Sequence, residues 1–106
     1  MENKRRFPRI LTELSVACQV EKARSVKASG KSFNLSFVGI GVKMENVFKA
    51  DDEVIITIRK PFWGHSVTIK GRIVWQREVP GQYESLMGIK FTEESSPKLD
   101  GIINSI

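Results

Sequence analysis

Hydrophobic and polar residues alternate along most of this chain, as they do in strands with one face in a core and the other in solvent. In the first such segment the apolar positions share one parity: Leu14, Val16, Cys18 and Val20. The same pattern predicts six strands, at residues 14–20, 25–34, 40–44, 54–59, 67–76 and 87–91. Polar turns separate them, among them residues 51–53 and 80–82.

Two of the predicted strands have irregular features. In the second strand, residues 29–31 read Ser-Gly-Lys, which forms a bulge or a turn as readily as the interior of a strand. In the fifth and longest strand, Trp75 has the parity of Ile69 and Ile73. Near the end of that strand Trp75 therefore shares a face with these residues, where it either plugs the rim of the barrel or lines a ligand pocket.

A helical period occurs only at the end of the chain, in residues 95–106. Ser95 or Ser96 can cap a helix there, and Pro97 suits its first turn. Apolar residues then recur at helical spacing, at Leu99, Ile102, Ile103 and Ile106. Strands followed by one helix predict an all-β fold: a six-stranded antiparallel β-barrel with a C-terminal α-helix over an open end.

Composition agrees with a single domain. The 106 residues are 41% hydrophobic and 27% charged, and they divide into a flexible basic arm (1–10), a barrel (11–92) and a helix (95–106). Cys18 is the only cysteine, which excludes a disulfide framework and favours a reducing compartment. Apolar runs are far shorter than the roughly 20 residues that span a bilayer. We expect a cytoplasmic protein that does not insert into membranes.

The residues needed for catalysis are missing from the sequence. His65 is the only histidine and has no cysteine or carboxylate cluster beside it, so a metal site or a Ser-His-Asp relay lacks its parts. The acids at residues 51–53 and 93–94 are typical of solvated turns. We expect no enzyme, no catalytic or metal-binding residue and no cofactor.

Positive charge is concentrated in the first third of the chain. Of the net charge of +5, residues 1–31 contribute eight basic residues against three acidic ones, and the rest of the chain is balanced. The densest cluster is the arm sequence Lys4, Arg5, Arg6 and Arg9. Arginine pairs with phosphate oxygens and with the O6/N7 edge of guanine. The arm therefore predicts a local anion site, and the alternative is an ordinary basic tail.

A second distinctive segment, residues 34–39, reads Asn-Leu-Ser-Phe-Val-Gly. Asn34 and Ser36 can bond to nearby backbone groups, and Gly39 can adopt a positive φ that other residues resist. Such a turn presents amides and a hydroxyl to a ligand. The alternative is a common strand connection.

Together, these two segments resemble the PilZ domain family. Arg5 to Arg9 fits its RxxxR motif, and Asn34 to Gly39 fits its [D/N]xSxxG motif, in the family's order and separation. The resemblance extends over the whole chain and implies a barrel that binds the bacterial second messenger cyclic di-GMP.

The resemblance also implies roles for individual residues. Arg5 and Arg9, with Arg6 between them, would hold guanine and phosphate, while Asn34, Ser36 and Gly39 would hold the second guanine and backbone. Trp75 is near a position where related domains place an aromatic residue beside the ligand. Lys4 precedes the RxxxR motif, where arginine-like residues favour two ligand molecules. Asn34 replaces the aspartate of many members, which lowers the expected affinity.

The sequence thus predicts a cyclic di-GMP receptor that passes its signal to a downstream partner protein and binds no DNA or RNA. One alternative is a nucleic-acid-binding barrel that uses the basic arm with Trp63 and Trp75, although the balanced charge of residues 32–106 opposes it. The other is a degenerate PilZ scaffold that binds protein but no nucleotide.

Overall fold

The computed structural model describes residues 13–59, 66–93 and 99, and six strands lie in this part of the chain. The strands are β1 (Ser15–Val20), β2 (Lys27–Leu35), β3 (Gly39–Glu45), β4 (Glu53–Arg59), β5 (Ser66–Glu78) and β6 (Glu84–Phe91). Each one follows an alternating segment of the sequence, because one side of every strand carries core side chains. The six predicted strands are confirmed.

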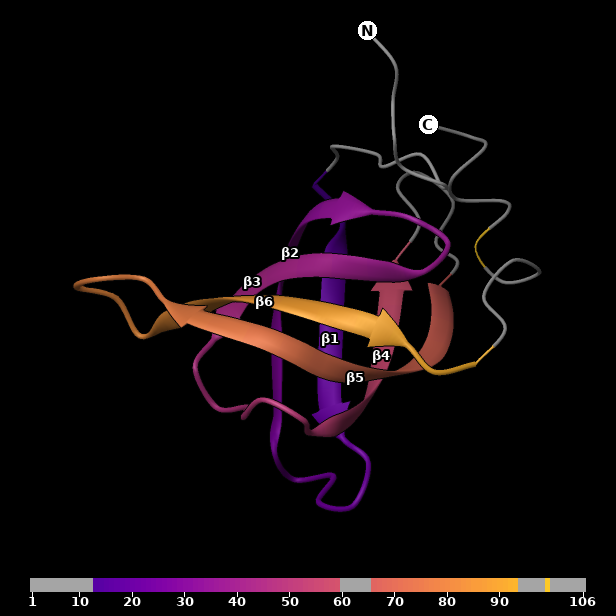
Figure 1. The fold of residues 1–106 in the computed structure, drawn as a ribbon, viewed down its shortest axis with the longest axis horizontal. Coiled ribbons are helices and arrows are strands. Elements are labelled where there is room, and N and C mark those ends of the chain that lie inside the picture. The colour runs from indigo at the N-terminus through magenta and orange to yellow at the C-terminus, as the bar shows by residue number, and fades with distance from the viewer. Residues whose placement is uncertain (1–12, 60–65, 94–98, 100–106) are drawn as a thin grey trace, which may run out of the picture.

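The strands form a closed barrel in the order β1-β2-β3-β6-β5-β4 (Figure 1). All neighbouring strands are antiparallel, and the pairing of β1 with β4 completes the ring. The prediction of a six-stranded antiparallel barrel is confirmed. The predicted helix at 95–106 lies outside the described residues except for Leu99, which is fully buried in the core.

The core fills the inside of the barrel with aliphatic side chains from every strand, including Val16, Leu35, Val42, Ile56, Ile73 and Met87. Cys18 belongs to this core, as its parity predicts, and is 2% exposed. Burial raises the pKa of the Cys18 thiol to about 12, and the negative charge of Asp52 acts in the same direction. The thiol is therefore protonated at neutral pH.

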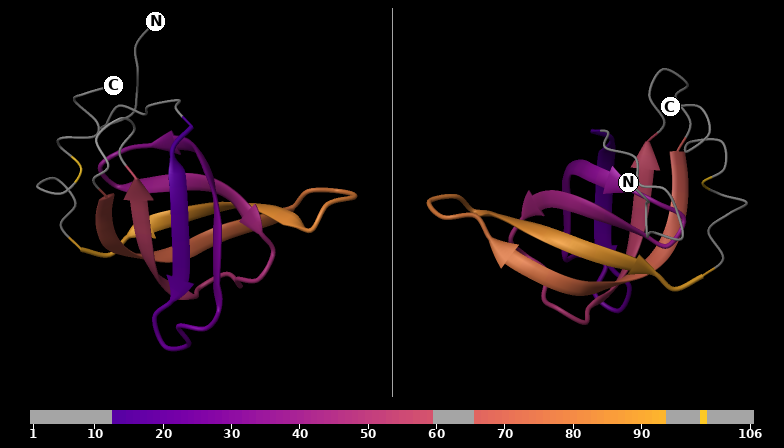
Figure 2. Two further views of the ribbon diagram at one scale, coloured as in Figure 1. Left: turned by 180° about the vertical axis from the view of Figure 1, so that it is seen from behind. Right: turned by 45° about the horizontal axis from the view of Figure 1, so that its top comes forward.

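The β5–β6 hairpin extends beyond the barrel wall (Figure 2). Residues 80–82 form its predicted turn, in which Gly81 has a φ of 75°. Tyr83 lies beside the turn and is 91% exposed. The other predicted turn, at residues 51–53, is also present, with Asp51 at a φ of 74° and Glu53 beginning β4.

Two bulges change which way side chains point. In β5, Ile73 pairs with Ile89 and Trp75 pairs with Gly88, so Val74 is an extra residue. This insertion turns Trp75 to the outside, where it is 44% exposed. The expectation that Trp75 shares the core face of Ile73 is therefore wrong.

The second bulge lies in β2, between Ser32 and Asn34. It is not at residues 29–31, which pair regularly with β1. Within the described residues, no helix is long and apolar enough to cross a membrane.

Candidate functional site

Four paired positions form a row across the outside of β2, β3, β6 and β5. Asn34 pairs with Gly41, Gly41 with Gly88, and Gly88 with Trp75. We call this the glycine row. The strands that carry it run side by side in Figure 1. Because the two middle positions are glycines, neighbouring side chains can lie over the backbone there.

Aromatic rings occupy the space over both glycines. A Cβ atom on Gly41 would lie 2.6 Å from two ring carbons of Phe33, and one on Gly88 would overlap the indole Nε1 of Trp75. The two ring centroids are 6.5 Å apart, with an angle of 49° between the planes. Phe33 is 37% exposed and Trp75 is 44% exposed, so the pair presents an accessible aromatic surface.

Asn34 is fixed at the β2 end of the row. Its Oδ1 accepts a hydrogen bond of 2.9 Å from the N–H of Gly41. Because a backbone N–H needs an acceptor, this bond determines which side-chain atom is the oxygen. The Nδ2 amide makes no hydrogen bond to the part of the chain that the structure describes. Asn34 therefore offers a donor to a ligand, suited to acceptors such as O6 and N7 of guanine.

Ser36 closes the turn between β2 and β3 and is 7% exposed. Its Oγ accepts a hydrogen bond of 3.2 Å from the N–H of Val38 and donates one of 3.5 Å to the carbonyl oxygen of Gly39. The backbone N–H of Ser36 also donates to the Gly39 carbonyl, at 3.0 Å. The described contacts of Ser36 thus hold the turn in shape, and its predicted contact with ligand stays a prediction.

The backbone conformation of Gly39 differs from the one expected, and its predicted contact with ligand stays a prediction. Gly39 does not adopt a positive φ, so that expectation is wrong. A Cβ at this position would lie 2.6 Å from the carbonyl oxygen of Ile89 on β6. Glycine is required here because the β3 and β6 backbones approach closely.

Two cations lie in the next row of paired residues on the same outer face of the barrel. Gly39 pairs with Lys90, and Lys90 pairs with Arg72. Lys90 is exposed and has no ion pair among the described residues, whereas Arg72 lies 4.0 Å from a carboxylate oxygen of Glu53. Lys90 therefore adds positive charge beside the aromatic surface.

The predicted arginine clamp of Lys4, Arg5, Arg6 and Arg9 lies outside the described residues. The structure does show where the chain joins the barrel. Leu14 donates a backbone hydrogen bond of 2.9 Å to Ser32 Oγ, and the N–H of Ser32 donates one of 2.9 Å to the Leu14 carbonyl. These two bonds hold Leu14 against Ser32, the residue before Phe33.

Sequence reasoning missed Phe33 and Lys90. A usable signal was present, because Gly41 and Gly88 occupy outward positions between buried neighbours. A glycine inside a strand often marks a site that another group approaches closely. The group at both positions is an aromatic ring.

Among the described residues, no group of three or more His, Cys, Asp or Glu could hold a metal ion. The described residues thus place a tilted aromatic pair, an amide donor and a lysine on one side of the barrel.

The PilZ domain family model matches residues 3–106, and the chain belongs to that family. No curated protein sequence matches it. Among solved structures, it resembles the PilZ domain of YcgR from Escherichia coli, described with c-di-GMP. The TM-score is 0.71 at 15% identity, covering 98% of this chain and 89% of that one.

Two further structures share the fold. The PilZ domain of CeSA from a cellulose-synthesizing bacterium has a TM-score of 0.65 at 20% identity, covering 93% of this chain and 94% of that one. The inhibitor of motility MotI/DgrA of Bacillus subtilis has a TM-score of 0.75 at 18% identity, covering 98% of this chain. This chain spans 50% of the length of MotI/DgrA.

Proposed function

We propose that this PilZ domain binds cyclic di-GMP on the outer face of β2, β3, β6 and β5 and signals to a partner protein. The observation that carries the proposal is the glycine row, which places the Asn34 amide and the Phe33–Trp75 pair on one side of the barrel. A purine stacks on an aromatic surface, and its O6 and N7 atoms accept hydrogen bonds.

Charge supports the same ligand class. Lys90 provides a cation within the described face. Arg9 is five residues before Leu14, so it lies within roughly 17 Å of that anchor even when the chain is fully extended. This reach allows the arm to bring Arg5 and Arg9 toward phosphates held over the row. The YcgR domain, described with c-di-GMP, is a family member with the same fold.

The function is that of a receptor and not of an enzyme. The residues assigned here bind and orient a ligand, with Asn34 as donor, Phe33 and Trp75 as stacking surface, and Arg5, Arg6, Arg9, Lys4 and Lys90 as counter-charges. Ser36 and Gly39 shape the turn beside them. Cyclic di-GMP is an intracellular messenger, so a cytoplasmic location belongs to the proposal.

Calorimetric titration of the purified chain with cyclic di-GMP tests the proposal. Arg5→Ala and Arg9→Ala should each weaken binding about tenfold or more, because each removes charge-assisted hydrogen bonds. Trp75→Ala should lose binding, whereas Trp63→Ala and His65→Ala should not. Asn34→Ala should also weaken binding about tenfold, because it removes the Nδ2 donor that Asn34 offers to O6 or N7 of guanine.

Controls with GTP and single-stranded DNA separate the alternatives. Two phosphates predict a shallow dependence of affinity on salt, while a nucleic-acid binder loses affinity steeply as counterions are released. Steep salt dependence with DNA and no response to cyclic di-GMP would refute the proposal. If no nucleotide gives a binding signal, the proposal is also refuted, and the alternative of a scaffold that binds protein but no nucleotide is favoured.

A further inference from the structure

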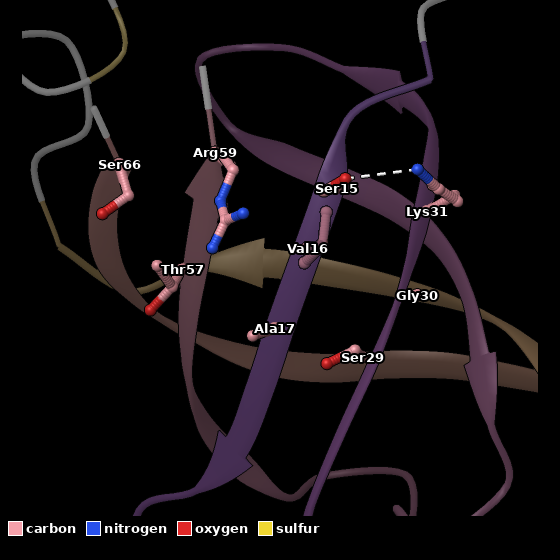
Figure 3. A pocket seen from close by; sticks show the side chains of 9 residues that line it. All are labelled: Ser15, Val16, Ala17, Ser29, Gly30, Lys31, Thr57, Arg59 and Ser66. Carbon is pink, nitrogen blue, oxygen red and sulfur yellow. Dashed lines mark hydrogen bonds between the residues drawn. The ribbon is translucent and has the colours of Figure 1, made fainter. Parts of the chain in front are cut away.

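A hollow lies on the opposite side of the barrel from the glycine row, over β2, β1, β4 and β5. Its volume is about 740 Å³, and its lining is mostly short and polar (Figure 3). Register explains the shape. Ser29 pairs with Ala17, Ala17 with Thr57, and Thr57 with Thr68, so a row of small side chains crosses four strands.

Two longer cations stand at the sides of this hollow. Figure 3 shows Lys31 of β2 and Arg59 of β4 on opposite sides of β1. Lys31 Nζ donates to Ser15 Oγ at 3.2 Å and is otherwise open to solvent. Arg59 is exposed and has no ion pair within the described part of the chain. The base of the hollow is thus formed by short side chains with hydroxyl and methyl groups, and a positively charged side chain lies on each side of it.

The positive charge continues along β2. Lys27 is exposed, pairs with Gln19, and has no ion pair among the described residues. Carboxylates occur at the ends of these strands: Glu13 precedes β1, Glu21 follows it and is bound to Lys70 at 3.3 Å, and Glu53 begins β4 and lies 4.0 Å from Arg72. The outward positions of β1, β2, β4 and β5 over the hollow therefore carry cations and hydroxyls without an acidic side chain.

We propose that this basic hollow docks an extended acidic segment of a partner protein. Lys27 and Lys31 are four residues apart on one strand, which separates them by about 13 Å. An extended peptide repeats its side chains on one face every second residue, about 7 Å apart, so carboxylates four residues apart on that face match this spacing. The hydroxyls of Ser15, Ser29 and Thr57 supply neutral hydrogen-bond donors between the cations.

Other occupants fit less well. No aromatic side chain lines the described hollow, so it lacks the stacking groups that single-stranded nucleic acids use. The chain's own arm is basic, and like charges oppose its docking here. The barrel is closed, so a partner segment cannot add a strand at an edge and binds through side chains instead.

The test is a titration of the full chain, labelled with ¹⁵N, with a short synthetic peptide in which glutamate alternates with threonine. No cyclic di-GMP is added. Amide shifts should be confined to β1, β2, β4 and the start of β5. Lys31→Gln and Arg59→Gln should each weaken binding about fivefold, the range of a well-formed exposed ion pair. Arg77→Gln, a matched change of an exposed arginine on the projecting β5–β6 hairpin, should leave the affinity unchanged.

Several results would overturn the docking proposal. One is equal binding of the same peptide with glutamine in place of glutamate. Another is a set of amide shifts centred on Phe33 and Trp75. A third is tighter binding of single-stranded DNA or inorganic phosphate than of the peptide at the same salt concentration. Shifts that grow with protein concentration alone would point to a second copy as the occupant. Cyclic di-GMP affinity, measured for Lys31→Gln in parallel, should equal that of the wild type, so this proposal and the proposed function fail independently.

Discussion

A substitution of Gly88 by alanine tests how closely the Trp75 indole packs against the barrel. A Cβ there would overlap the Trp75 indole, so Gly88→Ala should lower the free energy of unfolding by about 1–2 kcal/mol. In a Trp75→Ala background the obstruction is gone, and alanine restricts the unfolded chain more than glycine does. The same change should then stabilise the protein by roughly 0.5 kcal/mol. Urea denaturation of the four proteins in this cycle measures both values.

The sign of the Gly88→Ala effect in the Trp75→Ala background shows whether the Trp75 indole or the strand geometry requires glycine at position 88. Equal destabilisation in both backgrounds would mean that strand geometry, and not the indole, requires glycine at position 88. A cycle of Gly41→Ala with Phe33→Ala should keep part of the destabilisation, because a Cβ on Gly41 would also lie 2.9 Å from Asn34 Oδ1. The two cycles together measure how firmly each ring is held against the barrel before any ligand arrives.

Among the elements, β5 should tolerate a deletion at its bulge. Val74 is the extra residue of its bulge and is 51% exposed, so removing it leaves Trp75 opposite Gly88 and Ile73 in the core. The Val74 deletion should fold, with a cost below about 2 kcal/mol by urea denaturation.

Strand β4 provides the control, because its pairing with β1 and β5 has no bulge. Deleting Thr57 reverses the faces of the residues on one side of the cut, which places core side chains outside. That variant should not fold cooperatively. If the Val74 deletion also abolished cooperative folding, the bulge itself would be essential, and not only the faces on which it places the residues after it.

The same bulge explains where sequence reasoning succeeded and where it failed. Alternation located all six strands, because each has one face in the core. It placed Trp75 on the wrong face, since an extra residue in β5 leaves no local mark in the sequence and depends on the register with β6. The turn at residues 34–39 was recognised from composition, but the reason for Gly39 is a contact with Ile89 that only the fold creates.

For the whole molecule, closure of the barrel predicts uniform protection. Every strand is paired on both sides, so none can fray as an edge strand does. Amide hydrogen exchange should give the same opening free energy, equal to that of global unfolding, for the central residues of all six strands. The projecting hairpin near Gly81 should exchange by local opening. A strand pair with a distinctly lower value, β1 with β4 for example, would show that the ring opens at one seam.

Burial of Cys18 has a practical consequence for the study of signalling. The only native cysteine is inside the core, with its thiol protonated, and so should resist maleimide reagents while the protein is folded. A cysteine introduced at an exposed site such as Tyr83 would then be the single labelled position, with no need to alter the core. A fluorophore there would report contacts of the hairpin with a partner in an otherwise native chain.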